Sequence, residues 1–176
     1  MADTHVEQYD WQFNGKLTAT GVNTFTGTTT LGGIITGRTP VAFPSGTGLA
    51  LTQALHAGRS VYVTDLAAAY TLPAATGTGD KYRIVLGATQ TGAGTIKTTA
   101  SATMIGNAVL FQDGGASVNG FTAAAGDNTI DLLGTGNSTG GMIGATYDFE
   151  DVASTVWQVT IISDAGGTEA TPFSTT

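Results

Sequence analysis

The alternating pattern in residues 60–86 constrains the fold of this chain more than any other feature. Apolar residues alternate with polar ones in residues 61–64 and again in residues 81–86. A period of two is typical of strands with one buried face. Pro73 and the glycines of residues 77–80 interrupt the pattern, because proline cannot donate to a sheet and glycine favours tight turns. The stretch therefore predicts two or three short strands in one half of a small β-sandwich.

The rest of the chain adds more short strands separated by turns. Strands are predicted at residues 95–98, 108–111, 129–133, 145–149 and 156–162. The pairs Asp113-Gly114 and Asn119-Gly120 are the strongest hairpin signals, because both residues of a tight type I′ turn need positive φ. Residues 49–57 alone have helical spacing, for one or two turns before Gly58. Many short strands at regular spacing predict an all-β fold, a β-sandwich or jelly-roll-like head.

Trp157 is predicted to be the core anchor of this head. Val159 and Ile161 follow it at positions i+2 and i+4, so the three side chains share one face of a strand. A large aromatic in such a row is typical of a packed core rather than of a solvent-facing sheet surface.

Composition excludes several classes of function. The chain has 176 residues, enough for one domain, with a net charge of −7 and only six Lys and Arg residues. Nucleic acid binding requires clustered basic residues, and here they are scattered. Without cysteine there are no disulfides and no thiolate catalysis. No apolar run is long enough for a membrane span and the first ten residues do not resemble a signal peptide, so we expect a protein made in the cytosol.

The N-terminal segment carries three aromatics on one face of an extended chain. Tyr9, Trp11 and Phe13 stand at i, i+2 and i+4. Two interpretations remain open. The aromatics either form an edge strand packed on their own domain, or serve as an anchor for a partner, since aromatics supply large contact area at low entropic cost.

A six-residue quasi-repeat follows. Glycines recur at positions 15, 21, 27 and 33, and Phe13, Ala19, Phe25 and Leu31 precede each of them by two residues. An even period keeps each series on one face, so the strip presents one apolar side chain per repeat and cannot bury it alone. It needs sister chains in a trimeric stalk or the surface of another protein, unless it is only a linker. We therefore divide the chain into an extended N-terminal arm, residues 1–48, and a head, residues 49–176.

The polar residues do not assemble into a catalytic set. His5 and His56 are the only histidines, and no serine stands in a nucleophile context. Asp148, Glu150 and Asp151 form the densest acidic cluster. Asp148 and Glu150 would share one strand face, which suits a carboxylate pair or a hard-cation site but is more often just a solvated strand end. Asp127 and Asp131 are interpreted in the same way. We expect no catalytic residues, no metal and no cofactor.

Several segments of the head resemble a group of tailed-bacteriophage virion proteins that decorate heads, form head fibres or associate with tails. The similar segments are residues 56–61 (HAGRSV), 70–79 (YTLPAATGTG), 127–130 (DNTI), 140–141 (GG), 156–159 (VWQV) and 171–173 (TPF). Residues 23–33 separately resemble phage fibre shafts. The resemblance spans about residues 49–176. It implies a trimeric, β-rich virion component and transfers no catalytic residue.

The expected function is that of a structural virion protein that binds the outside of a phage capsid and decorates or cements it. Its partner would be the major capsid protein, with no nucleic acid or membrane involved, and it would be assembled in the host cytoplasm as a homotrimer. The residues expected to bind the capsid are Tyr9, Trp11, Phe13, Phe25 and Leu31 of the arm. A fibre-tip or receptor-binding module that recognises host surface glycans is the alternative, and a virion-associated depolymerase is the third.

Overall fold

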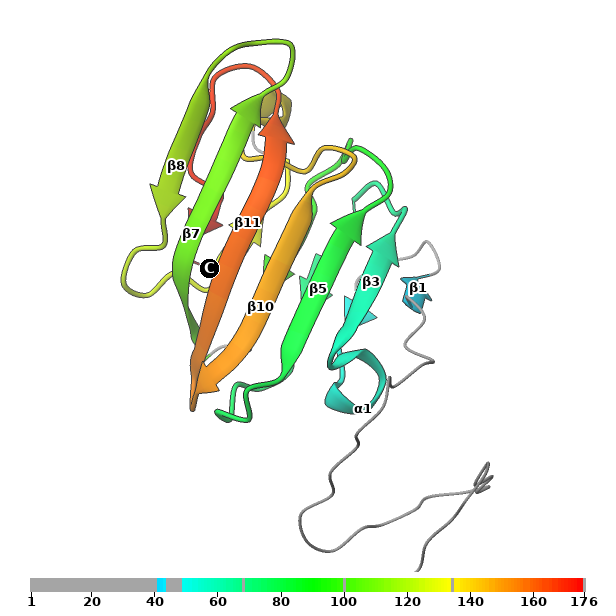
Figure 1. Ribbon diagram of the computed structural model, residues 1–176, viewed down its shortest axis with the longest axis vertical. Coiled ribbons are helices and arrows are strands. Elements are labelled where there is room, and N and C mark those ends of the chain that lie inside the picture. The colour runs from blue at the N-terminus through cyan, green and yellow to red at the C-terminus, as the bar shows by residue number, and fades with distance from the viewer. Residues whose placement is uncertain (1–40, 44–48, 68, 100, 134, 176) are drawn as a thin grey trace, which may run out of the picture. The chain divides into compact units, whose positions relative to one another are not determined.

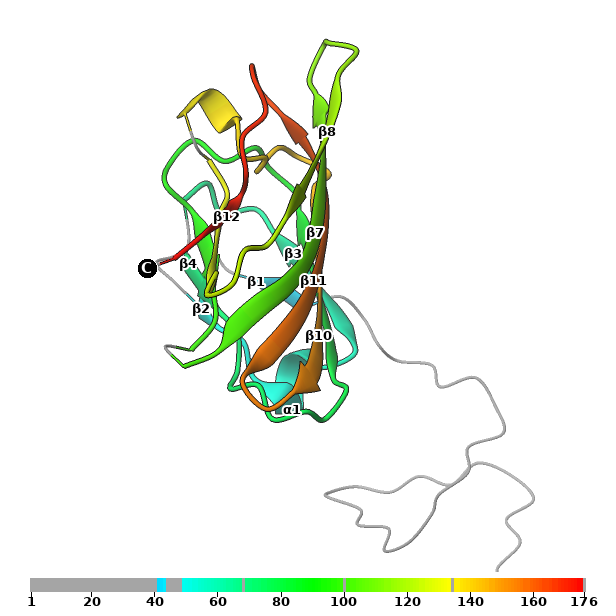
Figure 2. The ribbon, with the colours of Figure 1, turned by 90° about the vertical axis from the view of Figure 1, so that its left-hand side faces the viewer.

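The head is an all-β sandwich, as predicted. The computed structural model describes residues 41–43, 49–67, 69–99, 101–133 and 135–175. Two mixed sheets lie face to face (Figures 1 and 2). The seven-stranded sheet has the order β1 (Val41–Phe43), β3 (Arg59–Val63), β5 (Lys81–Leu86), β10 (Thr146–Ala153), β11 (Val156–Ala165), β7 (Thr103–Gln112) and β8 (Val118–Thr122). The five-stranded sheet has the order β12 (Phe173–Ser174), β9 (Thr129–Asp131), β6 (Thr95–Lys97), β4 (Ala69–Thr71) and β2 (Leu49–Ala50).

The first six strands alternate between the two sheets, so the chain winds as a flattened coil. β1, β3 and β5 run parallel in the larger sheet, and β2, β4 and β6 run parallel in the smaller one. Parallel neighbours cannot be joined by a tight hairpin and need a crossover. Here a strand of the opposite sheet lies within each crossover. Residues 60–86 therefore span both layers, and the prediction that they form one half of the sandwich is wrong.

One of the two predicted hairpin turns is confirmed. Asp113-Gly114 lies in the turn between β7 and β8, where Gly114 has a φ of 68°. Asn119-Gly120 is not a turn, because both residues lie inside β8 and pair with Leu110 and Val109. The long strand β7 continues past them, and Asn119 also donates a hydrogen bond to Glu169 Oε2 at 3.1 Å. Pairing with β7 thus overrides the local turn preference.

The core lies between the sheets and follows the period-two pattern. In β11 the buried residues alternate strictly with exposed ones, and Trp157, Val159 and Ile161 all face inward. β5 and β10 alternate in the same way, which buries Tyr82 and Ile84 on the same inner face. β5, β10 and β11 therefore each have one side in the core and one side on the surface.

Helical structure is brief. Within the segment predicted to be helical, only α1 (Gln53–His56) is a helix, because Leu49–Ala50 form β2. Gly58 follows the helix with a φ of 65°, as a residue that ends a helix often does. A single 3₁₀ turn, η1, spans Thr135–Asn137. No helix among the described residues has the length and hydropathy that crossing a membrane would require.

The head begins earlier in the chain than residue 49. β1 lies within the segment that we assigned to the arm, and it pairs in parallel with β3 at one edge of the larger sheet. Val41 stands opposite Val61 and Phe43 opposite Val63. A truncation that keeps the whole sheet must therefore retain residues 41–43.

Candidate binding surface

The outer face of the seven-stranded sheet carries the most concentrated group of charged side chains among the described residues. Because Tyr82, Tyr147 and Val159 point into the core, their neighbours in β5, β10 and β11 point outward. Six of the outward polar side chains from these three strands line one cavity, and they are Lys81, Arg83, Asp148, Glu150, Gln158 and Thr160. Figure 1 views the molecule onto this face.

Strand register arranges these side chains in two rows across the sheet. In the first row Arg83 stands opposite Asp148, and Asp148 stands opposite Thr160. Ser60 of β3 extends this row, because it is in register with Arg83. In the second row Lys81 stands opposite Glu150, and Glu150 opposite Gln158. Directly opposed side chains on one face are close enough to interact.

Each carboxylate of the two rows is paired with a cation. Arg83 donates from Nε to Asp148 Oδ1 at 2.6 Å and from Nη2 to Asp148 Oδ2 at 2.9 Å, a bidentate pair. Hydrogen bonding to Asp148, and then its charge, raises the pKa of Arg83. Lys81 Nζ lies 3.3 Å from Glu150 Oε2. Both pairs are exposed, so each contributes little to stability, but they fix where donors and acceptors stand.

These rows line a shallow cavity of about 470 Å³. Arg59, at the start of β3, also lines it and donates to the Leu55 carbonyl oxygen at 3.1 Å. Of the four Lys and Arg residues that the structure describes, three therefore border this one cavity. We call the cavity with Ser60 and the six side chains of the two rows the polar cup.

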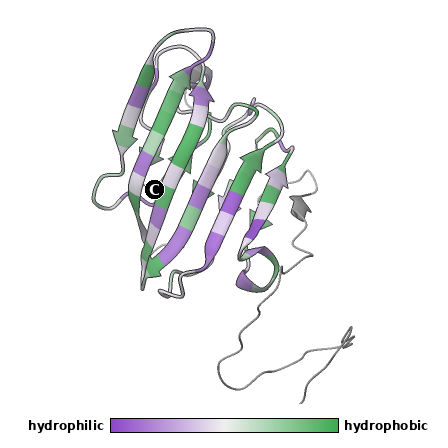
Figure 3. Cartoon of the chain, viewed as in Figure 1, coloured by the Kyte–Doolittle hydropathy of each residue, from purple (hydrophilic) through white to green (hydrophobic). Residues whose placement is uncertain are grey.

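The other half of the same face is apolar. Four exposed apolar side chains gather there beside the exposed polar residues Asn107 and Asp164. They are Val109, Phe111, Val118 and Ile162, which are between 37% and 54% exposed, and we call them the apolar patch. Val109 stands opposite Ile162, and Phe111 stands opposite Val118. Figure 3 shows the contrast between the apolar stretches of β7 and β11 and the polar lower parts of β5 and β10. The outer face thus divides into a hydrogen-bonding half and an apolar half.

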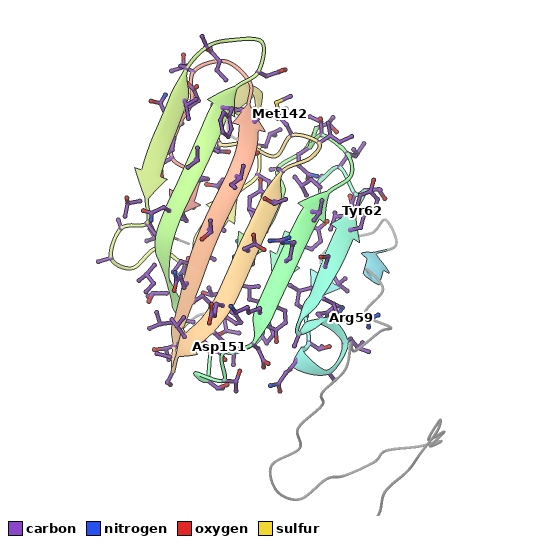
Figure 4. The ribbon with its side chains drawn as sticks, viewed as in Figure 1. Arg59, Tyr62, Met142 and Asp151 are labelled. Atoms are coloured by element: carbon purple, nitrogen blue, oxygen red, sulfur yellow. The ribbon has the colours of Figure 1, made fainter. Side chains whose placement is uncertain are left out.

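Tyr62 adds an aromatic to this face beside the polar cup. It follows Ser60 by two residues in β3 and is 45% exposed (Figure 4). Its phenol end lies over Gly87, since a Cβ built at Gly87 would stand 2.3 Å from Tyr62 Cζ. Glycine at position 87 therefore allows the ring to lie close to the sheet.

Asp151 is a third acid of this region, but it faces the opposite way. Its side chain is buried, and the loop before β5 wraps around it. Oδ1 accepts from the Gly77 N–H at 2.7 Å, and both oxygens accept from the Thr76 N–H at 3.0 Å. Thr78 donates from its hydroxyl at 3.1 Å. The LPAATGTG segment is thus anchored to β10 through one carboxylate.

The pKa of Asp151 is lowered by these contacts. Burial alone would raise the pKa of this carboxyl, but hydrogen bonds from the backbone N–H groups of Thr76, Gly77 and Thr78 outweigh burial. The carboxylate is therefore a structural group held in its ionised form. It was predicted as part of one acidic cluster with Asp148 and Glu150, whereas alternation along β10 places it on the inner face.

Some of the other predicted residues lie outside the described residues, and the rest have structural positions in the head. Tyr9, Trp11, Phe13, Phe25 and Leu31 lie outside the described residues. Trp157 is 1% exposed, and its Nε1 has no hydrogen-bond partner among the described residues. His56 ends α1, where its Nδ1 accepts from the Thr52 N–H at 2.8 Å. Asp127 Oδ2 accepts from the Ala124 N–H at 2.7 Å.

Sequence reasoning missed the polar cup. Alternation within β5 does place Lys81 and Arg83 on one face, and alternation within β10 does the same for Asp148 and Glu150. The missing information was that β5 and β10 are neighbours in the sheet.

Within the described ranges no three His, Asp or Glu side chains gather as metal ligands.

The chain matches no protein-family model, no curated protein and no solved structure.

Proposed function

We propose that this chain is a structural protein of a tailed-phage particle, which binds the outside of the capsid and decorates or cements it. The resemblance of residues 49–176 to phage virion proteins supports the proposal that the chain is part of a phage particle. The aromatic residues and the six-residue repeat of the arm support the proposal that the arm binds the capsid. The head would be displayed outward, and the partner would be the major capsid protein.

The observation that carries this proposal is the place where the chain joins the larger sheet of the head. Residues 41–43 join the larger sheet at the β1 edge, whereas β8 lies at the opposite edge, six strand positions away. The residues that precede β1 are therefore joined to the head through an edge strand of the larger sheet. This arrangement suits a display domain on a tether.

Self-association into a homotrimer is part of the proposal. Ten large apolar side chains are exposed among the described residues, and five of them lie on the outer face of the larger sheet in β7, β8 and β11. They are Ile105, Val109, Phe111, Val118 and Ile162. Exposed apolar side chains gathered on one face are typical of protein contact surfaces. A trimer also multiplies weak capsid contacts through avidity.

We further propose that the protein is not an enzyme. Glycoside cleavage needs two carboxyl groups that flank a bond, one of which holds a proton. Asp148 and Glu150 instead stand in exposed sheet positions, each engaged by a basic side chain. This arrangement favours binding over hydrolysis.

Capsid co-sedimentation tests the attachment. Capsids assembled from the proposed partner, the major capsid protein of the same phage, are mixed with the full chain, with residues 38–176, and with the Trp11→Ala full chain. We expect the full chain to sediment with capsids, the truncated chain to stay in the supernatant while melting cooperatively, and Trp11→Ala to bind more weakly with an unchanged melting temperature. Full occupancy by residues 38–176 would place the attachment surface on the head instead.

The alternative function is a receptor-binding module for host surface glycans. One specific observation favours it, the polar cup, because a concave grid of donors and acceptors on an exposed sheet suits a hydroxyl-rich ligand. Display on a capsid and recognition of a glycan are compatible in one chain.

A further inference from the structure

We propose that the polar cup is a saccharide-binding site that recognises an oligosaccharide through its hydroxyl groups. The inference goes beyond attachment to a capsid and does not depend on it, because every residue involved lies in the head. It identifies the site that the alternative function would use.

The dimensions of the polar cup suit an extended oligosaccharide. Its first row crosses four adjacent strands from Ser60 through Arg83 and Asp148 to Thr160. Neighbouring strands are about 4.8 Å apart, so the row is roughly 14 Å long, and residues two apart in a strand separate the two rows by about 7 Å. With a cavity of about 470 Å³ above them, the rows have room for two or three sugar rings laid along the surface.

The chemistry of the rows matches hydroxyl groups. A sugar hydroxyl can both donate and accept a hydrogen bond. Each row places a donating side chain beside an accepting one and ends at a side chain that can do both. The carboxylates of Asp148 and Glu150 only accept, Lys81 and Arg83 only donate, and the hydroxyl of Thr160 and the amide of Gln158 do both. An adjacent pair of ring hydroxyls can therefore donate to a carboxylate while accepting from the cation beside it.

The ion pairs keep these groups in place before any ligand arrives. The bidentate contact between Arg83 and Asp148 holds both side chains in one geometry, with N–O distances of 2.6 and 2.9 Å. A site that is ordered in advance loses less conformational entropy on binding. Pairing also makes the two rows electrically balanced within a chain of net charge −7. The two rows therefore require no charge on their ligand, and Arg59 adds one positive charge at the border of the cavity.

Tyr62 supplies an apolar surface two residues beyond Ser60 along β3. It points to the same side as Ser60, and its contact with Gly87 holds the ring against the sheet while 45% of the residue stays exposed. The C–H faces of pyranose rings pack on aromatic rings, and tyrosine combines such a surface with a hydrogen-bonding hydroxyl. We therefore infer that a bound oligosaccharide extends from the polar cup toward Tyr62.

Titration of the ¹⁵N-labelled full chain tests the site directly. The probes are maltohexaose, cellohexaose, chitohexaose and a hexamer of mannuronate, each added to millimolar concentration. We expect at least one of the neutral probes to shift amides of β3, β5, β10 and β11 in a saturable manner. No shift in these strands with any probe would overturn the proposal, and so would binding of the mannuronate hexamer alone, since that would mark charge attraction rather than hydroxyl recognition.

Matched variants locate the binding. Replacing the first-row pair by Arg83→Gln with Asp148→Asn removes both charges and leaves polar side chains, with a shorter one at position 83. It should lower the affinity for the best probe about tenfold or more. Tyr62→Ala should also lower the affinity for that probe. Asp164→Asn removes an exposed carboxylate from the outer face of β11 outside the polar cup, and it should leave the affinity unchanged. Equal affinity in the Arg83/Asp148 double variant and the parent would overturn the site.

Failure here is distinguishable from failure of the proposed function. A chain that sediments with capsids but binds no probe leaves the decoration proposal in place and removes the saccharide site. A chain that binds a probe but no capsid leaves the saccharide site in place and removes the decoration proposal.

Discussion

Tyr82 and Trp157 pack edge to face in the core, with ring centroids 5.5 Å apart and ring planes at 78°. Removal of the indole would leave a cavity between two sheets that are each held by strand pairing. We therefore expect Trp157→Ala to lower the free energy of unfolding by about 3–5 kcal/mol. Urea denaturation followed by circular dichroism measures the change.

The matched control is the next residue in the chain. Gln158 is exposed on the outer face of the same strand, so Gln158→Ala should change the free energy of unfolding by less than about 0.5 kcal/mol. Equal urea midpoints for the Trp157→Ala variant and the parent would contradict the core role of Trp157.

Asp151 should make stability depend on pH in the acid range. Its pKa in the folded protein lies below 3.8, the ordinary value for Asp, so the ionised form is the one that stabilises the fold. This contribution is complete above the unfolded-state pKa and is lost as the pH falls below 3.8 and through the folded-state pKa. Urea denaturation between pH 7 and acid pH should show stability falling over this window.

Substitution tests the same carboxylate at neutral pH. Asp151→Asn leaves buried N–H groups without a charged acceptor and should cost about 1–3 kcal/mol. It should also flatten the acid dependence. Asp148→Asn, exposed on the opposite face of the same strand, should change stability much less, because exposed ion pairs contribute little. The same loss in both variants would argue against the special role of Asp151.

Two glycines with positive φ should respond differently to a methyl group. A Cβ at Gly106 would lie 1.9 Å from the Val159 carbonyl oxygen, whereas a Cβ at Gly114 would meet nothing within 4 Å. Gly106→Ala should therefore cost about 3 kcal/mol or more, from strain and lost β7–β11 pairing, and Gly114→Ala only about 1 kcal/mol from its backbone conformation. Melting temperatures rank the two, and a reversed order would contradict the close approach of β7 to β11.

The full chain should be a homo-oligomer in solution. Light scattering at micromolar concentration should give a mass close to three times 17.7 kDa. The apolar patch of the head is a surface that one chain leaves exposed to partners. A monodisperse species of 17.7 kDa would rule out the trimer.

The protein should leave oligosaccharides intact. Prolonged incubation of the parent chain with the hexamers named above, with and without a chelator, should give no shorter products by mass spectrometry. If products do form, and Asp148→Asn with Glu150→Gln abolishes them, the depolymerase function would replace the proposed one.

Strand faces could be predicted from the sequence, but strand partners could not. The alternation in β5 and β11 is strong enough to identify Tyr82, Ile84 and Trp157 as inward residues. It contains no information about which strand lies next to which. The winding of β3, β4 and β5 between two sheets was missed for this reason, because a parallel neighbour lies about 20 residues away in the chain.

The same limit applies to the candidate site. Ser60, Arg83, Asp148 and Thr160 come from four strands spread over 100 positions of the sequence, and only the register of the folded sheet places them in one row. Asp151 was within reach of sequence reasoning, since Tyr147 and Phe149 precede it at the buried positions of the same alternation. Treating the three acids as one cluster hid that difference.

The place of β11 in the larger sheet has a consequence for biosynthesis. β11 is the last strand of its sheet in the sequence, yet it lies between β10 and β7. Until residues 156–165 have left the ribosome, β8 and β7 cannot join the strands from β1 to β10, and two partial sheets remain with open edges. Open edges are the surfaces through which nascent chains aggregate. Translation that stops before β11 would therefore release an aggregation-prone chain rather than a smaller head.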